Sequence, residues 1–188
     1  MMPREYKQYL YLAGIAAASW LLVKFTGLEE AERISAPAHS ADYFSKGYSK
    51  WEMDERGKLN SKLLADRMVH YSDDGTIHLD NPVMFFYNEQ TPPWIIKSET
   101  GIRSADGKNI LLNGKVSVDR AGAKGIRQLK INTTNVRVQP ETSHAETEAW
   151  AELISPPNVT TGTGMKLTFR EPIHLELLAN VRGKYETK

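Results

Sequence analysis

Two patterns of hydrophobic positions divide the chain. Near the N-terminus, residues 9–23 read YLYLAGIAAASWLLV, contain no charged residue and carry aromatic residues at both ends. From about residue 43 onward, hydrophobic residues instead alternate with polar ones in short runs rich in Val, Ile, Leu, Thr and aromatic side chains. The first pattern predicts a membrane-inserting helix, and the second predicts a succession of β-strands.

The uncharged N-terminal run is short for a membrane span, which needs about 20 residues, and it allows three interpretations. An uncleaved anchor with Arg4 and Lys7 before it and acidic residues after it would have its N-terminus in the cytoplasm, by the positive-inside rule. A signal peptide would be cleaved near the small residues 16–19. A buried core helix is disfavoured by the terminal position. We expect the anchor, because apolar residues continue through Val23, beyond any such cleavage site.

The chain is therefore expected to have three segments. Residues 1–26 form a transmembrane anchor with a short cytoplasmic tail, residues 27–42 a juxtamembrane linker without steady periodicity, and residues 43–188 one folded domain. The expected fold class is all-β with antiparallel strands, because short alternating runs are separated by turn signals and no helical period follows the anchor. The turn signals are Asp74-Gly75, Asp106-Gly107, Asn113-Gly114 and Gly162-Thr163-Gly164.

A weak internal repeat aligns residues 63–83 with residues 96–116, each read as a strand, a turn and a returning strand. Any chain of hairpins shares turn residues at similar spacing, so the same match can arise without a common unit.

Alternation also predicts which side chains face inward. The candidates for lining an apolar, lipid-binding interior are Tyr48, Ile77, Leu79, Val83, Phe85, Leu112 and Val116. An ordinary sandwich core would show the same alternation, so the pattern alone does not distinguish a groove from a core. The run at residues 83–87 is apolar on both faces and needs cover on each.

The final alternating run, residues 173–185, has no later segment to cover it, and we expect it to form an edge strand. Its candidate partner-docking residues are Leu175, Leu177, Val181 and Tyr185. An exposed edge can accept a strand from a partner protein. Alternatively, Lys184 and the charged residues after it can blunt the edge against pairing.

Composition removes several classes of chemistry. The formal net charge is +1, which does not favour nucleic acid as a partner, and the chain has no cysteine for a thiol nucleophile or a Cys-bound metal. The five histidines have no metal-binding spacing, and the signatures GxSxG, GxxxxGK[ST] and GxGxxG are absent. Asp73 and Asp74 precede Gly75 and are explained by a turn. We expect no metal, no cofactor and no enzymatic activity.

Several segments together resemble one known family. They are LLADRMVHY at 63–71, IHLDNPV at 77–83, PWIIKSETG at 93–101, LLNGKVSV at 111–118, GMKL at 164–167 and LELLANVRGKYE at 175–186. With the anchor and the all-β body, the chain is similar to the LptC family, the bitopic component C of the lipopolysaccharide transport machine.

This resemblance implies a twisted, open antiparallel β-jellyroll whose interior carries the acyl chains of lipopolysaccharide. It also implies two partners. An inner-membrane ATP-driven extractor complex, a permease pair and its ATPase, delivers the lipid, and a soluble periplasmic bridge protein of the same fold receives it. The implied location is the inner membrane, single-pass, with the C-terminal domain in the periplasm. The residues by themselves also leave open an anchored scaffold module without lipid cargo and an anchored periplasmic hydrolase.

Overall fold

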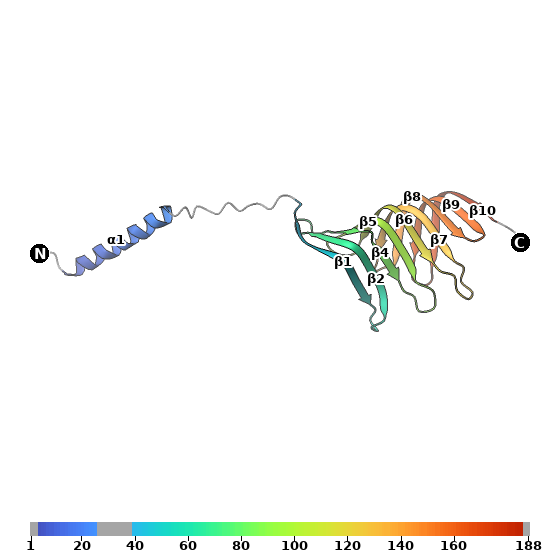
Figure 1. The fold of residues 1–188 in the computed structure, drawn as a ribbon, viewed down its shortest axis with the longest axis horizontal. Helices are drawn as coiled ribbons and strands as arrows, with labels where there is room; N and C mark the ends of the chain where they lie inside the picture. The colour runs from blue at the N-terminus through green and yellow to red at the C-terminus, as the bar shows by residue number, and fades with distance from the viewer. Residues whose placement is uncertain (1–3, 26–38, 186–188) are drawn as a thin grey trace. The chain divides into compact units, whose positions relative to one another are not determined.

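The computed structural model describes residues 4–25 and 39–185, and the chain divides into two compact units, residues 1–38 and 39–188. The first unit contains the helix α1 (Arg4–Phe25), drawn in blue in Figure 1. Alanine and leucine, both strong helix formers, supply much of its sequence, and Lys24 in its last turn complements the helix dipole. Most of the expected linker lies outside the described residues.

No helix in the described part of the chain has the combined length and apolar character required to cross a membrane. The span expected within residues 1–26 is therefore not found among the residues that the structure describes.

The second unit is a single ten-stranded antiparallel sheet, which confirms the all-β prediction. Its strands are β1 (Ala41–Met53), β2 (Leu59–Tyr71), β3 (Ile77–Asp80), β4 (Val83–Phe86), β5 (Trp94–Arg103), β6 (Ile110–Arg120), β7 (Leu129–Gln139), β8 (His144–Ser155), β9 (Asn158–Thr168) and β10 (His174–Lys184). They pair in sequence order, and β3 and β4 lie end to end between β2 and β5. The sheet is open, with β1 and β10 as its edges. The first strand begins at Ala41, two residues inside the expected linker.

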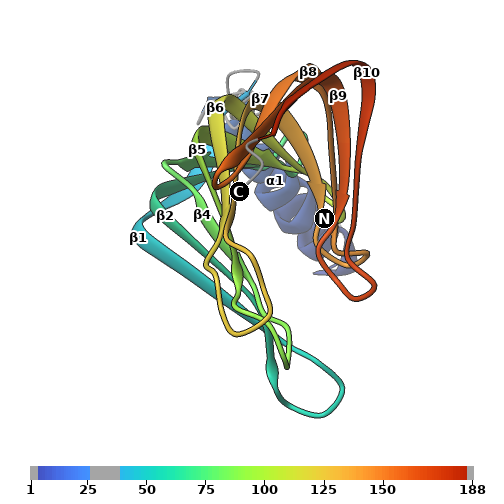
Figure 2. The same ribbon diagram turned by 90° about the vertical axis from the view of Figure 1, so that its right-hand side faces the viewer.

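Irregularities near the middle of the strands bend this sheet. The register shifts by one or more residues along five successive strand pairs from β5 to β10. Residues with positive φ lie within these strands, namely Gly114, Asn135, Gly164 and Asn180. Extra residues of this kind kink a strand and increase its twist. The result is the strong curvature seen in Figure 2.

Contacts across the interior show that the curved sheet closes over itself. Trp94 lies at one end of the strand ladder. It pairs with Arg120 at the end of β6, and Arg120 pairs with Leu129 at the start of β7. Phe169 follows β9 at the opposite end of the ladder, next to His144. The two aromatic rings nevertheless meet, with centroids 5.6 Å apart. Strand halves from opposite ends of the sheet therefore face each other and enclose the core.

Two of the four predicted turns are turns, and two are not. The Asp74-Gly75 and Asp106-Gly107 pairs close the β2–β3 and β5–β6 hairpins, and each glycine has positive φ. Asn113-Gly114 and the 162–164 segment instead lie inside β6 and β9. A bulge can require the same positive φ at glycine as a hairpin turn does, so the two are alike in sequence.

Candidate functional site

The apolar interior is the first candidate site, and the structure brings most of the predicted lining residues into it. Leu79, Leu112 and Val116 are fully buried in one continuous hydrophobic cluster. Tyr48 and Ile77 are partly buried and pack against this cluster. Their placement inside is confirmed, whereas their contact with lipid stays a prediction.

The inward placement of Val83 and Phe85 is wrong. Their neighbours Met84 and Phe86 are the buried residues of β4. Asn81, with φ +49°, and Pro82 interrupt the strand between β3 and β4. The alternation of buried side chains changes parity between Leu79 and Met84, so every residue of β4 faces opposite to simple alternation from Leu79. The pairing partners β2 and β5 change parity at the same place, and their register against β3 and β4 is continuous.

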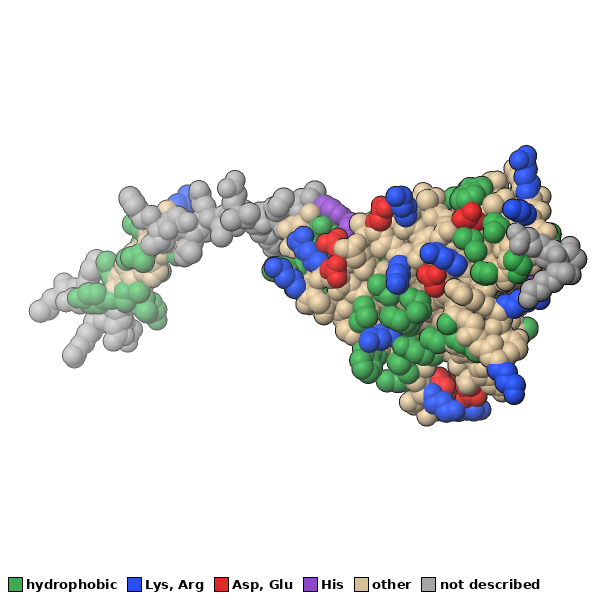
Figure 3. Space-filling view, turned by 45° about the vertical axis from the view of Figure 1, so that its right-hand side comes forward, with side chains coloured by type: hydrophobic (Ala, Val, Ile, Leu, Met, Phe, Trp, Pro, Cys, Tyr) green, Lys and Arg blue, Asp and Glu red, His purple; other side chains and the backbone are tan. Residues whose placement is uncertain are grey.

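Phe85 consequently lies on the outer face of the sheet, where its ring stacks on Tyr87 at a centroid distance of 6.3 Å. Figure 3 shows hydrophobic side chains gathered on one part of the sheet unit, with Lys and Arg side chains among and around them. One face of the 83–87 run thus packs in the core, and the other face lies on an outer surface where its side chains are partly buried.

Three aromatic residues, Phe86, Trp94 and Phe169, close the interior. The ring of Phe169 stacks on Phe86 at 4.8 Å, and Trp94 packs edge-on against it. The side-chain amide of Asn88 donates a hydrogen bond of 3.0 Å to the carbonyl of Phe169. These contacts bridge strand halves that are far apart in the ladder. The sequence signal for Trp94 was its alternation with Ile96, and Phe169 alternates with Leu167 in the same way.

The interior is filled by its own side chains in this structure. Trp94, Ile96, Val118, Ile131, Met165 and Leu167 have no solvent exposure. A packed interior of this kind admits an acyl chain only where the two facing halves of the sheet move apart, because protein cores have few voids larger than a water molecule.

A polar lip, formed by Lys50, Glu52 and Ser61, borders this interior beside β1. Lys50 and Glu52 project from β1, and the Lys50 ammonium lies 2.5 Å from the Glu52 carboxylate, which also accepts a 2.7 Å hydrogen bond from Ser61. Partial burial raises the pKa of Glu52, but the hydrogen bonds from Lys50 and Ser61, with the charges of Lys50 and Arg103, outweigh burial and hold the pKa below its ordinary value. These contacts therefore favour the ionised form of Glu52.

The sheet edge formed by β10 is the second candidate site, and the edge position predicted for residues 173–185 is confirmed. Leu175 and Leu177 are partly buried and pack against the core, whereas Val181 and Tyr185 are 55% and 69% exposed. Leu175 and Leu177 therefore contribute to the core, whereas Val181 and Tyr185 face solvent. Docking at any of the four stays a prediction.

The opposite edge, β1, was not predicted as a site. It carries large hydrophobic side chains that are at least half exposed, namely Phe44, Trp51 and Met53. The available signal was its position as the first strand of an open meander, which leaves one side unpaired. Cations lie over two of these rings, with Arg67 6.0 Å from Phe44 and Lys62 4.9 Å from Trp51.

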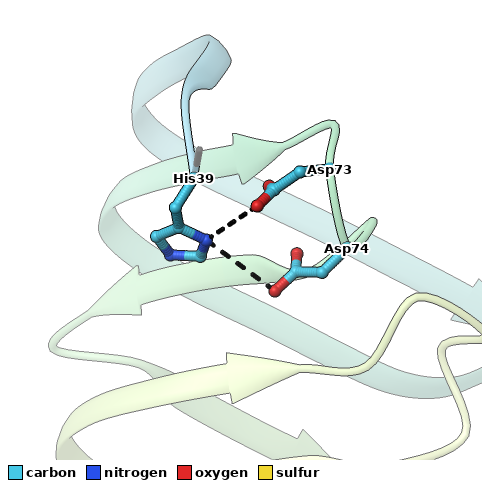
Figure 4. Close-up of side chains that lie close together, drawn as sticks. All are labelled: His39, Asp73 and Asp74. Carbon is cyan, nitrogen blue, oxygen red and sulfur yellow. Dashed lines mark hydrogen bonds and ion pairs between the residues drawn. The ribbon is translucent and has the colours of Figure 1, made fainter. Parts of the chain in front are cut away.

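Two histidine–carboxylate pairs fasten the beginning of the sheet unit. His39 Nδ1 lies 3.2 Å from Asp73 and 4.0 Å from Asp74 (Figure 4), and His70 Nδ1 lies 2.7 Å from Asp42. The hydrogen bond from His70 holds the pKa of Asp42 below its ordinary value.

In the group of His39, Asp73 and Asp74, the two aspartates belong to the β2–β3 turn. Its potential ligand atoms lie within 4.8 Å of one another, which is close enough to share a metal ion. All three residues are exposed, however, and Asp74 already accepts hydrogen bonds from the backbone and the hydroxyl of Thr76. These bonds lower the pKa of Asp74 and explain its place beside Gly75, as the sequence predicts.

A hollow of about 660 Å³ lies across β6–β10 near the bend. Leu111 and Leu178 supply apolar surface, and Arg137 pairs with Glu146 at 3.5 Å on its wall. It contains none of the predicted site residues, so the pattern of alternation gave no indication of it.

Two comparisons with known proteins gave a match, one to a family model and one to a solved structure. A family model described as lipopolysaccharide-assembly, LptC-related matches residues 9–186. Among solved structures, the chain is similar to LptH of Pseudomonas aeruginosa, described as the LptA homologous periplasmic component of the conserved lipopolysaccharide transport device. The identity is 8%, the match covers 77% of this chain and 94% of that chain, and the TM-score is 0.47. No curated protein sequence matches.

Proposed function

Because the chain belongs to the LptC-related family of lipopolysaccharide-assembly proteins and so takes part in lipopolysaccharide transport, we propose a specific role for it as a relay. It accepts lipopolysaccharide from an inner-membrane ATP-driven extractor complex, a permease pair and its ATPase. It then passes the lipid to a soluble periplasmic bridge protein of the same fold. The acyl chains travel through the apolar interior of the sheet.

The observation that carries this proposal is the continuity of the apolar interior between two free sheet edges. Buried hydrophobic side chains extend from Leu63 on β2 to Leu167 on β9 without interruption, and partly buried leucines continue the cluster onto β10. Burial of each acyl methylene contributes about 0.8 kcal/mol, which offsets the loss of side-chain contacts when the halves separate. A lipid can thus replace contacts that the protein makes with itself.

Site-specific crosslinking tests this role. A photoreactive residue in place of Leu79 or Leu112 is expected to crosslink lipopolysaccharide when the extractor and ATP are present, because both side chains face the interior. The matched control is Phe85, which lies on the opposite face of the same sheet and should give no adduct. Crosslinking at Phe85 but at neither leucine would show that lipid runs over the outer face and would overturn the proposal.

We further propose that α1 holds the sheet unit at the inner membrane, with the N-terminus in the cytoplasm and the sheet in the periplasm. Arg4 and Lys7 at the start of α1 support this orientation through the positive-inside rule. Exposed apolar side chains such as Leu12 and Ile15 also favour attachment, because a lone helix cannot bury them itself. A reporter active only outside the cytoplasm, fused after Lys188, is expected to be active in the membrane fraction. A silent reporter contradicts this location.

A further inference from the structure

Arg103, the last residue of β5, is a half-buried cation without a fixed partner. Its guanidinium makes no hydrogen bond or ion pair within the described residues 39–185, although the charge is near enough to lower the pKa of Glu52. It lies against Gly107, where φ is +73° and a Cβ would collide with the guanidinium. The glycine in the β5–β6 turn thus leaves room for the Arg103 side chain, and the N–H donors of the guanidinium remain unused.

Cations outnumber carboxylates along the cleft beside Arg103, which is lined by Lys50, Lys62 and Arg103 against Glu52. The charge of Arg103 also lowers the pKa of Asp106 in the adjoining β5–β6 turn. Glu52 is paired with Lys50, and Asp106 is hydrogen-bonded to Ser104 and to the backbone of Lys108, so neither carboxylate uses the donors of Arg103. A guanidinium with free donors favours an oxyanion, and its planar fork matches phosphate in a bidentate geometry.

The same cleft opens onto the apolar interior. Leu63, Met84 and Ile110 form its inner wall, and all three belong to the core cluster. The cleft has a volume of only about 20 Å³, close to that of one water molecule, so an anion would sit at its mouth. Cations at the mouth and hydrocarbon beyond them are complementary to an amphiphile with an anionic head.

We propose that Arg103 binds a phosphate group on the head of an acylated cargo whose chains occupy the interior. This inference rests on the proposed lipid relay and deepens it by assigning a subsite for the head group. The acyl chains enter between the facing halves of the sheet, and the phosphate remains at the polar lip. Arg103 then orients the lipid and keeps its charged head out of the core, where burial of an unpaired charge is costly.

Binding of two probes with the same chain and different heads tests the subsite. Full-length protein is titrated with dodecyl phosphate and with uncharged dodecyl maltoside. In Arg103→Gln, affinity for dodecyl phosphate is expected to fall about tenfold, the loss typical of a charge-assisted hydrogen bond, while dodecyl maltoside binds as to the wild type. Arg103→Lys should restore part of the affinity because it keeps the charge. Arg67→Gln is the matched control, since Arg67 is exposed on β2 and lines no part of the cleft.

Five outcomes would overturn the inference. The subsite is rejected if Arg103→Gln weakens both probes equally, which indicates a structural role, or if Arg67→Gln weakens dodecyl phosphate to the same extent. It is also rejected if inorganic phosphate binds as tightly as dodecyl phosphate, because the acyl chain would then contribute nothing to the binding of the phosphate group. If neither amphiphile binds wild-type protein, the lipid-carrying interior itself fails. Binding of dodecyl maltoside without any preference for dodecyl phosphate rejects only the subsite.

Discussion

Replacing Leu79 with aspartate is expected to destabilise the sheet unit by more than about 4 kcal/mol, enough to abolish lipid transfer. Leu79 is 1% exposed and lies between Met68 on β2 and Gly101 on β5. No cation lies among the buried residues of this cluster, so a carboxylate there would be desolvated without a partner. Urea unfolding monitored by tryptophan fluorescence measures the loss.

Leu111→Asp is the matched control for this substitution. Leu111 precedes the buried Leu112 on β6, points to the opposite face and is 41% exposed, so the same change should cost about 1 kcal/mol or less. An equal loss at the two positions would contradict the assignment of faces. Retention of full stability by Leu79→Asp would show that the interior is hydrated in solution, against the packed core described above.

Deleting residues 180–188 is expected to abolish capture of the soluble bridge protein while the remaining chain still associates with the extractor. The deletion removes the C-terminal half of β10 with Val181, and also Tyr185, which follows the strand. The exposed backbone donors and acceptors that an added strand would use are lost with it. Residues 174–179 keep their pairing with β9, so the core cluster retains Leu175 and Leu177. Co-purification of both partners from membranes provides the measurement.

Photocrosslinking gives the control for this deletion. A photoreactive residue at Tyr185 should trap the bridge protein, whereas one at Phe44 on the opposite edge should not. Trapping at Phe44 would assign the bridge protein to β1, and normal capture by the truncated protein would show that the C-terminal half of β10 is not the docking surface. Neither result bears on whether the interior carries lipid, so docking and lipid binding are tested separately.

The two candidate sites differ in how far the sequence could predict them. The edge at β10 followed from its position after the last turn, and that position requires no knowledge of the other strands. Within the edge, however, the division between Leu177, which packs on the core, and Val181, which is exposed, depends on the register shift between Ala179 and Arg182. The polar lip was not predicted at all, because Glu52 and Arg103 become neighbours only when the sheet closes.

The sequence by itself determined the strands, their antiparallel order and most of their inward faces, because alternation and turn residues act through neighbours in the chain. Only the tertiary structure decided that Asn113-Gly114 is a bulge and not a turn, and that the change of parity between Leu79 and Met84 turns Phe86 inward in place of Phe85. It also decided the meeting of Phe86 and Trp94 with Phe169. A positive φ satisfies a turn and a bulge equally well, and the choice between them depends on which distant side chains fill the interior once the strands bend.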